Sequence, residues 1–201
     1  MNRHLFITME GIEGVGKTTQ VNLLYDFLKK KGLDIVLTRE PGGLPISEAI
    51  RNILLHKDMS PMTELLLYEA ARAEHFDRII SPALDKGQTV LCDRFTDASV
   101  AYQGYGRGLD LKLIDQLNSI ATRNVQPDLT FVIDLPVDLA FKRLGTRGTT
   151  PDRFEKLSHD FYEKVRNGYI EQSKKYPKRV FMIDANKTPE EIHKDIVSKI
   201  L

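Results

Sequence analysis

The stretch Gly11-Ile12-Glu13-Gly14-Val15-Gly16-Lys17-Thr18 matches the pattern G-x-x-x-x-G-K-[ST] of phosphate-binding P-loops. It follows the apolar run Leu5–Met9 and opens an amphipathic segment, so the motif lies between an expected strand and an expected helix. Glycines let backbone N–H groups curl around a phosphate, and a helix N-terminus adds positive potential. The alternative is a glycine-rich turn that binds nothing, and the strand–loop–helix context argues against it. We therefore expect a nucleotide of the ATP type to bind here.

Two side chains of this loop have separate tasks. Lys17 can reach the β- and γ-phosphates of the nucleotide, and the Thr18 hydroxyl can coordinate Mg²⁺. The expected ATP site consists of the loop, the threonine after it and one later arginine: Gly11, Ile12, Glu13, Gly14, Val15, Gly16, Lys17, Thr18, Thr19 and Arg143.

Outward from the loop, apolar runs rich in β-formers alternate with helical patterns, which indicates a parallel sheet with crossover helices. Several runs are continuously apolar, as in strands that are covered on both faces. The expected strands are Leu5–Met9, Ile35–Thr38, Thr89–Cys92, Leu129–Ile133 and Val180–Ile183. The pattern predicts a three-layer α/β fold with a five-stranded parallel sheet, flanked by helices, in a single domain over residues 1–201.

Five helices can be recognised from their apolar spacing and their ends. The first runs from Thr18 to Lys31 and stops at Gly32, a second follows Ser47, and a third opens at Pro61 and extends to Ile80. A fourth carries an apolar stripe of Phe154, Leu157, Phe161 and Val165. The last begins with the capping box Thr188-Pro189-Glu190-Glu191 and buries Ile192, Ile196 and Ile200.

Composition excludes several classes of protein. Lys+Arg 29 against Asp+Glu 28 leaves a net charge of +1, which gives no general field for nucleic acid or a membrane surface. The run Leu5–Met9 is too short for a signal-peptide core or a membrane span. A solitary cysteine, Cys92, excludes an internal disulfide framework and is most simply a small buried strand residue. We expect a cytoplasmic location.

The P-loop motif covers switch GTPases, ATP-driven motors and small-molecule kinases. A GTPase should carry a guanine-reading N-K-x-D, but the nearest stretch, Asn186-Lys187-Thr188-Pro189, lacks the aspartate. Motors usually need a larger body than 201 residues allow. The small kinases fit best, although a kinase for another acceptor, a non-catalytic nucleotide-binding module and a regulatory switch remain the rival readings.

An acid at the end of an apolar strand can hold Mg²⁺ or its waters. Asp93 ends the run Thr89–Cys92, and the guanidinium of Arg94 beside it can fork onto phosphate oxygens. Asp134 ends a similar run but lacks the arginine. We therefore assign the metal to Thr18 and Asp93, and we interpret Asp134 as a structural acid at a strand end.

Thr38-Arg39-Glu40-Pro41-Gly42-Gly43 lies past the second expected strand, on the sheet edge where α/β proteins bind ligands. Two later pairs, Tyr68 with Arg72 and Ser99 with Gln103, are each four residues apart and so share a helix face. A ring and an arginine could stack on and hydrogen-bond a planar base, while a glutamine offers both a donor and an acceptor. The alternative for each pair is an ordinary helix surface.

Together these stretches resemble the thymidylate kinase family of bacterial type, within the P-loop nucleoside monophosphate kinases. The resemblance rests on Gly11–Thr19, Thr38–Gly43, Ala70–His75, Asp93–Ser99 and Ala101–Gly104, and runs in order from residue 5 to at least residue 155. It implies the P-loop kinase fold, transfer of the γ-phosphate of ATP to dTMP with Mg²⁺, a place in dTTP synthesis, and a homodimer.

The resemblance also implies roles for individual residues. Arg39, Arg51 and Arg94 would bind the acceptor phosphate, with Glu40 in the same site. Tyr68 would stack on thymine, although the family more often has Phe there, and Arg72 would bond a base carbonyl. The remaining implied contacts are Ser99 and Gln103 on the polar edge of the base and Tyr102 against the sugar, where it disfavours a 2′-hydroxyl.

Arg143, Arg147 and Arg153 surround Gly145, Gly148 and Pro151, a composition that fits a closing lid at about 143–155 or an ordinary basic loop. Thymidylate kinases carry a catalytic cation in the P-loop or in the lid, and the variable P-loop positions here hold no base. The resemblance therefore assigns this cation to the lid, to Arg153 first and Arg147 next. Glu13 resembles the acid of lid-type members and would orient an arginine or a water.

No general base is needed, because a nucleotide phosphate with a second pKa of about 6 is already anionic at neutral pH. The task is to bring two polyanions together in line, so Lys17, Mg²⁺ and the lid arginines would screen their repulsion. The expected catalytic set is Lys17, Arg94, Arg153, Arg147 and Glu13. In related kinases the loop at Asp184-Ala185-Asn186-Lys187 packs on adenine.

Overall fold

The computed structural model describes residues 4–145, 153–155 and 157–200. Within them, five strands form one parallel sheet: β1 (Phe6–Glu10), β2 (Ile35–Arg39), β3 (Thr89–Asp93), β4 (Leu129–Asp134) and β5 (Val180–Asp184). The order β2-β3-β1-β4-β5 makes the first strand the central one. All five predicted strands are confirmed, and each observed end lies within one residue of the expected end.

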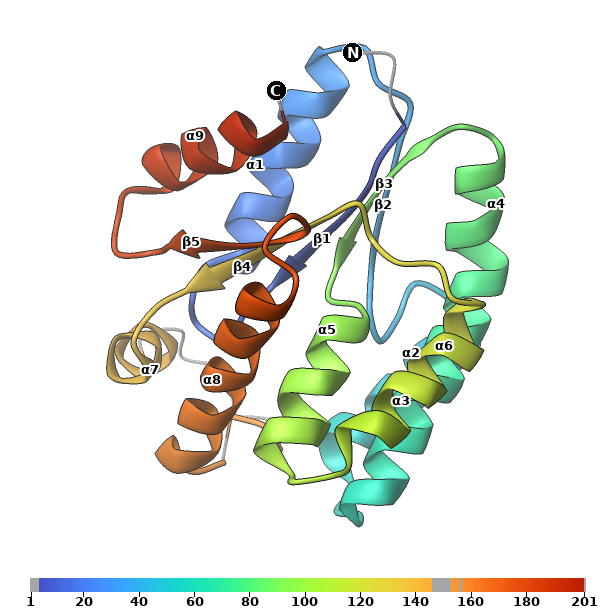
Figure 1. The fold of residues 1–201 in the computed structure, drawn as a ribbon, viewed down its shortest axis with the longest axis vertical. Coiled ribbons are helices and arrows are strands. Elements are labelled where there is room, and N and C mark those ends of the chain that lie inside the picture. Colours follow the sequence, from blue (N-terminus) through green and yellow to red (C-terminus); the bar gives the residue numbers. More distant parts are fainter. Residues whose placement is uncertain (1–3, 146–152, 156, 201) are drawn as a thin grey trace.

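Helices cover the sheet on both faces. Helix α1 (Lys17–Lys30) packs against β1, β2 and β3, and α9 (Pro189–Ile200) packs against α1 and β5. Figure 1 shows these two helices together at the top of the molecule. On the other face, α4 (Ser81–Asp85) packs against β3 and α8 (His159–Lys175) packs against β5. The predicted α/β fold with flanking helices is confirmed.

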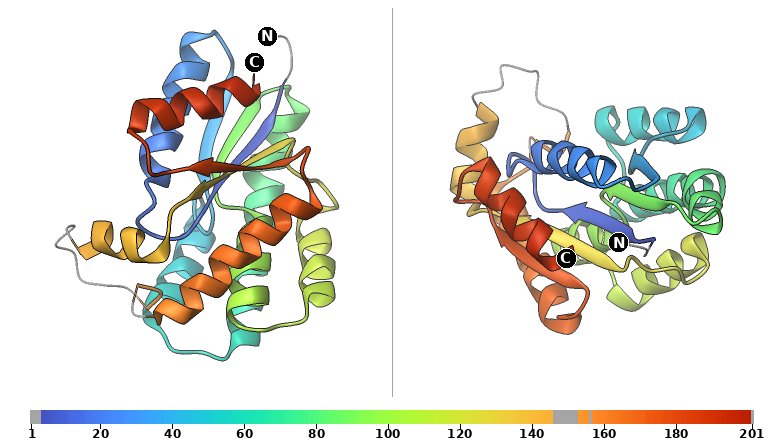
Figure 2. Two further views of the ribbon diagram at one scale, coloured as in Figure 1. Left: turned by 60° about the vertical axis from the view of Figure 1, so that its left-hand side comes forward. Right: turned by 90° about the horizontal axis from the view of Figure 1, so that it is seen from above.

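The remaining helices build the half of the molecule beyond the carboxyl ends of the strands (Figures 1 and 2). The helix α3 and the π-helix η1 run on directly into α4, and η2 packs on α8. Their bounds are α2 (Pro45–His56), α3 (Pro61–His75), η1 (Phe76–Ile80), α5 (Thr96–Ser99), η2 (Val100–Gly106), α6 (Leu111–Thr122) and α7 (Val137–Gly145).

The core follows the alternation of side chains along the strands. In β1, Phe6 joins a cluster with Phe76 and Ile80, whereas Ile7 joins one with Leu24 of α1. Because successive strand residues point to opposite faces, both faces of β1 are buried by helices. This explains the continuously apolar strand sequences. Cys92 is a buried free cysteine of the first cluster, as predicted.

The expected helix ends are partly confirmed. Gly32 follows α1 with a φ of 80°, which glycine adopts without strain, and the capping box holds with Glu191 N donating to Thr188 Oγ1 at 3.3 Å. Helix α2 begins at Pro45, before the expected Ser47. The long helix from Pro61 widens into π-helical turns over Phe76–Ile80.

The prediction that Phe154 and Leu157 belong to a helix is wrong. Helix α8 begins only at His159, because the Ser158 side chain accepts a hydrogen bond from Phe161 N at 3.2 Å and so caps the helix. Phe154 is buried all the same, in the cleft described below. In the described part of the chain, no helix combines the length and the apolar character needed to span a membrane.

Candidate active site

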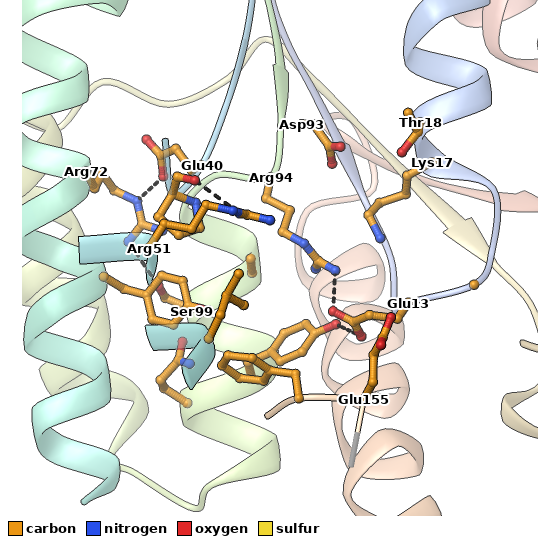
Figure 3. A pocket seen from close by; sticks show the side chains of 18 of the residues that line it. Glu13, Lys17, Thr18, Glu40, Arg51, Arg72, Asp93, Arg94, Ser99 and Glu155 are labelled. Carbon is orange, nitrogen blue, oxygen red and sulfur yellow. Dashed lines mark hydrogen bonds and ion pairs between the residues drawn. The ribbon is translucent and has the colours of Figure 1, made fainter. Parts of the chain in front are cut away.

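A cleft of about 240 Å³ opens beyond the carboxyl ends of β1 and β3, with the P-loop at one end and α2, α3 and η2 at the other (Figure 3). This is where parallel α/β sheets bind ligands. Its lining residues are Glu13, Gly14, Gly16, Lys17, Thr18, Glu40, Pro41, Arg51, Leu55, Tyr68, Arg72, Asp93, Arg94, Ala98, Ser99, Tyr102, Gln103, Phe154 and Glu155.

Two glycines let the P-loop lie against distant parts of the chain. Gly11 has a φ of 130°, and a Cβ there would lie 2.4 Å from the Ile133 carbonyl oxygen of β4. Gly14 has a φ of 80°, and a Cβ there would lie 2.4 Å from the Ala140 carbonyl oxygen of α7. Only glycine fits either position. The loop conformation therefore depends on β4 and α7 as well as on β1 and α1.

Lys17 is turned into the loop. Its Nζ donates to the carbonyl oxygens of Gly11 at 2.9 Å and Ile12 at 2.8 Å. Burial lowers the pKa of Lys17 to about 8, and repulsion from Arg94 acts in the same direction. The ammonium is thus held among backbone oxygens at the place where a P-loop lysine meets phosphate.

The two candidate metal acids differ in their partners. Asp93 Oδ1 is buried and has no hydrogen-bond partner among the described residues, while Thr18 lines the same end of the cleft (Figure 3). Asp134 instead makes a two-pronged ion pair with Arg166 of α8, at 2.7 and 2.8 Å. A carboxylate and a hydroxyl oxygen at the P-loop are the hard ligands that Mg²⁺ prefers. Asp134 is a structural acid, as interpreted above.

Arg94 lies at the middle of the cleft (Figure 3). Its φ of 70° is unusual for a residue with a side chain, and its Nη2 donates to Glu13 Oε1 at 2.8 Å. Tyr102 Oη donates to Glu13 Oε2 at 2.7 Å, and the Arg94 guanidinium lies 5.0 Å from the Tyr102 ring centroid. Although burial raises the pKa of Glu13, the charges of Arg94 and Lys17 hold it below its usual range. Glu13 therefore forms an ion pair with Arg94, and its expected role of orienting an arginine or a water stays a prediction.

Arg72 is completely buried beneath the acceptor end. Its Nε donates to Glu40 Oε2 at 2.8 Å, its Nη1 donates to Ser99 Oγ and Asn118 Oδ1 at 2.9 Å, and its Nη2 donates to Phe95 O at 3.1 Å. It also pairs with Glu69. Nη2 carries two hydrogens, and among the described residues it donates only to Phe95 O.

Aromatic rings form the acceptor end. Phe154 packs edge-on between Tyr68 and Tyr102, with ring centroids 6.3 and 6.1 Å away. Burial raises the pKa of the Tyr68 phenol above its usual value, so it is neutral at physiological pH. The predicted pairs do share one pocket, since Tyr68, Arg72, Ser99 and Gln103 all line the cleft. These positions are cleft walls, and the ordinary-surface alternative is wrong for both pairs.

Of two further predicted arginines, Arg51 lies in the cleft and Arg39 lies outside it. Arg39 does not line the cleft: its Nη2 pairs with Glu48 of α2 at 2.7 Å, and both side chains are exposed. Glu48 Oε1 also accepts from Gly43 N at 3.0 Å, which fixes the carboxylate beside the end of β2 and retains Arg39 there. Arg51 does line the cleft and donates from Nη1 to Pro41 O at 3.1 Å.

The structure describes two of the three expected lid arginines, Arg143 and Arg153. Arg153 does not line the cleft, because its Nε donates to Leu54 O at 2.8 Å and its Nη2 lies 2.7 Å from Glu64 Oε2. The structure thus puts Arg153 at the acceptor end, contrary to its expected place at the transferring phosphate. Arg143 Nη2 donates to Ala185 O at 3.1 Å, beside the expected adenine loop. Arg147, with residues 146–152, lies outside the described residues.

Sequence reasoning missed several residues of the site. Glu64 and Arg107 border Gln103, and Tyr169 and Glu10 lie behind Arg94. A signal existed for the first two, because Glu64 is four residues before Tyr68 and Arg107 four after Gln103. For Glu10 and Tyr169, 159 residues apart, no local pattern signals the contact.

A P-loop after the central strand of a parallel sheet, a strand-end acid beside it and an arginine-rich second pocket define a nucleotide kinase. The family model of thymidylate kinase matches residues 9–196. The chain is 51% identical to thymidylate kinase of Citrifermentans bemidjiense over 90% of this chain and 84% of that protein. It is 47% identical to the Kosmotoga olearia enzyme over 98% and 95%.

The crystal structure of thymidylate kinase from Ehrlichia chaffeensis superposes with a TM-score of 0.81, at 39% identity and with 98% of both chains covered. This chain belongs to the thymidylate kinase family, whose members phosphorylate dTMP to dTDP with ATP. It is a kinase that serves dTTP biosynthesis.

Proposed function

We propose that this kinase transfers the γ-phosphate of ATP in line to dTMP, with Mg²⁺, across the cleft between the P-loop and the α3–η2 pocket. One observation carries the proposal: Lys17 and Thr18 line one end of the cleft, Arg51 and Arg72 line the other, and Arg94 lies between them (Figure 3). This places cationic side chains along the whole line that two phosphate groups would share.

The residues at the donor end suit a magnesium nucleotide. The buried, unpartnered Asp93 Oδ1 and the Thr18 hydroxyl would hold Mg²⁺, either directly or through its waters. When bound, the ion neutralises charge on the β- and γ-phosphates. Lys17 would exchange the carbonyl oxygens of Gly11 and Ile12 for phosphate oxygens, and Arg143 would lie against the adenine side.

At the acceptor end, Arg51 and Arg94 would bind the dTMP phosphate, and Tyr68 would stack on the base. Arg72 would donate its remaining Nη2 hydrogen to a base carbonyl, and Gln103 would meet the ring N–H beside it. Ser99 holds Arg72 in place, and Tyr102 would press against the sugar. Glu40 acts through Arg72, and Arg39 is left out of this site because it pairs with Glu48.

The attacking phosphate oxygen is already ionised at neutral pH, so no side chain has to remove a proton. The protein's work is to hold two polyanions together and to stabilise charge on the moving group. Arg94 is suited to this, because Glu13 fixes its guanidinium and only Tyr169 otherwise contacts it by hydrogen bond among the described residues.

We also propose a homodimer and a cytoplasmic location. Helices α2, α3 and α6 expose large apolar side chains: Ile46, Ile53, Met62, Leu66, Leu111 and Ile120. Helix α3 packs against both of the others, so these side chains come from one group of helices. A second copy of the chain would cover such a face. The cytoplasm supplies both nucleotides, and the chain's single cysteine is a free thiol.

The test is ADP release from Mg²⁺ATP with a panel of nucleoside monophosphates that includes dTMP, dUMP, dCMP and dGMP, with and without EDTA. We expect strong stimulation by dTMP, its loss with EDTA, and its loss in Lys17→Met. Stimulation by a purine monophosphate in preference to dTMP would show that the acceptor pocket is assigned wrongly. If the protein binds ATP but no monophosphate stimulates ADP release, it is a non-catalytic nucleotide-binding module rather than a kinase.

The same panel tests individual acceptor contacts. Gln103→Ala should raise the KM for dTMP with little change in kcat, because the contact is made in the bound state as well as in the transition state. The matched control is Gln88→Ala, a glutamine that bonds Asp34 on the surface. An unchanged KM in Gln103→Ala would remove this residue from base recognition.

A further inference from the structure

Glu64 is a buried carboxylate of α3 that lies behind the acceptor pocket rather than in its lining. Gln103 Nε2 donates to its Oε1 at 2.9 Å. Arg107 donates from Nε to Oε1 at 3.2 Å and from Nη2 to Oε2 at 2.9 Å, and Arg153 Nη2 lies 2.7 Å from Oε2. One acid thus holds a base-facing amide and two arginines.

A carboxylate can only accept hydrogen bonds, so it dictates how a neighbouring amide is turned. Although burial raises the pKa of Glu64, the hydrogen bonds from Arg107 and Gln103 hold it below its usual range. The side chain is therefore ionised at neutral pH, and Gln103 must present its nitrogen to it. The opposite arm of the amide is the carbonyl oxygen.

That carbonyl oxygen has no hydrogen-bond partner among the described residues, and Gln103 lines the acceptor pocket. Arg72 lines the same pocket, and among the described residues its Nη2 donates only to Phe95 O. The same pocket therefore holds an acceptor, Gln103 Oε1, and a donor, Arg72 Nη2. Thymine and uracil carry the complement, an N3–H next to a carbonyl, whereas cytosine has an unprotonated N3 next to an amino group and mismatches both partners.

We propose that Glu64 is the positioning residue that selects for a pyrimidine with N3–H, because its carboxylate locks the Gln103 amide with the carbonyl oxygen toward the base. This rests on the proposed acceptor site. The selection rejects dCMP and does not distinguish dTMP from dUMP, since both bases have N3–H. The rival reading is that Glu64 only neutralises Arg107 and Arg153.

The test is Glu64→Gln, assayed by kcat/KM for dTMP, dUMP and dCMP. An amide at position 64 can either accept from Gln103 or donate to it, so Gln103 is free to turn over. We expect the dTMP:dCMP preference to fall at least about tenfold, the scale of one mispaired buried hydrogen bond. The dTMP:dUMP preference should stay unchanged. An unchanged dTMP:dCMP preference in the folded variant would overturn the proposal.

Two variants separate positioning from charge balance. Glu64→Asp keeps an acceptor-only group and should retain most of the preference for dTMP over dCMP. Arg107→Gln removes an ion pair of Glu64 but leaves the carboxylate, so it should lower stability without lowering that preference. If Arg107→Gln lowers the preference as much as Glu64→Gln does, the role of Glu64 is structural.

A measurement on the parent protein decides the case if Glu64→Gln does not fold. The Gln103 side-chain amide, assigned by NMR through its loss in Gln103→Met, should show protons protected from exchange both without and with dTMP. Rapid exchange, or an amide that turns when dTMP binds, would contradict a lock by Glu64. Absence of dTMP turnover in the parent would instead refute the acceptor site itself.

Discussion

At the scale of single residues, Lys17 shows how the P-loop is kept in shape. Its ammonium occupies the centre of the P-loop and donates to two backbone carbonyl oxygens. Burial and the repulsion from Arg94 bring the pKa of Lys17 down to about 8, within reach of ordinary buffers. A bound phosphate would favour the charged form and reverse this shift.

Affinity for ATP should therefore fall as the pH rises through about 8. Only the protonated lysine binds phosphate well, so affinity for ATP is lost above the pKa of Lys17. We expect about tenfold weaker binding at pH 9 than at pH 7. Calorimetric titration across this range measures it. Lys17→Arg, which stays charged throughout, should bind less tightly but with a flat profile; a flat profile in the parent would contradict the prediction.

The sequence and the structure predict different effects for a substitution of Arg153. Its expected place in the lid predicts a loss of kcat in Arg153→Ala, whereas its contacts with Leu54 and Glu64 predict a higher KM for dTMP. We expect the second result, with KM raised several-fold and kcat changed less. Arg78→Ala, on the surface, is the control. A large loss of kcat at unchanged KM would return Arg153 to the chemistry.

At the scale of elements, the end of β1 is tied to two distant segments by one buried acid. Glu10 Oε1 accepts from Phe95 N at 2.7 Å, and Tyr169 Oη of α8 donates to Oε2 at 2.8 Å. Burial, followed by the nearby Asp97 charge, raises the pKa of Glu10 to about 8. The carboxyl therefore joins β1, the turn after β3 and α8 mainly in its protonated form at neutral pH.

A raised folded-state pKa stabilises the fold fully below the unfolded value of 4.5, and this contribution is lost as the pH rises through about 8. Relative to Glu10→Gln, the parent's free energy of unfolding should thus fall by an amount on the order of 4 kcal/mol between pH 5 and pH 9. Urea denaturation of both proteins measures the difference. Glu163→Gln, exposed on α8, should show the same pH dependence of the free energy of unfolding as the parent. If the difference in this free energy between the parent and Glu10→Gln did not change with pH, the titration of buried Glu10 would be refuted.

The elements were predictable to different degrees for physical reasons. Strands such as Leu129–Asp134 are buried on both faces, so a continuous apolar run in the sequence predicts them. The start of α8 was not predictable from the apolar spacing, since Phe154 fits the stripe yet is held by the cleft, and a single serine decides where the helix begins. The spacing of apolar residues predicts neither the residues that contact the Phe154 ring nor the serine that caps the helix.

The site divides in the same way. The P-loop and the pairs Tyr68–Arg72 and Ser99–Gln103 follow from spacing, because their members lie within one element or two adjoining ones. Arg39 was misplaced because only the fold brings Glu48 to it. Glu64 was missed because its partners Gln103 and Arg107 come from η2 and from the residue after it, 39 and 43 positions along the chain.

At the scale of the whole molecule, the apolar side chains exposed on α2, α3 and α6 make association the expected state. The parent should have twice the monomer mass of 22.9 kDa by light scattering. Ile53→Lys, on α2, should shift it toward the monomer because a lysine cannot be buried without a partner. Lys30→Glu, on α1, serves as the control. A monomeric parent would contradict the dimer.

The contact of Gly11 with the Ile133 carbonyl has a consequence for biosynthesis. The P-loop motif lies within the first 18 residues and is synthesised early. The strand β4, on which the loop conformation depends, follows more than a hundred residues later. A nascent chain released before residue 134 thus carries the motif without the binding loop. Retention of ribosome-bound intermediates on an ATP matrix should begin only after β4 and α7 have emerged, so nucleotide capture would report when these two elements have packed against the P-loop.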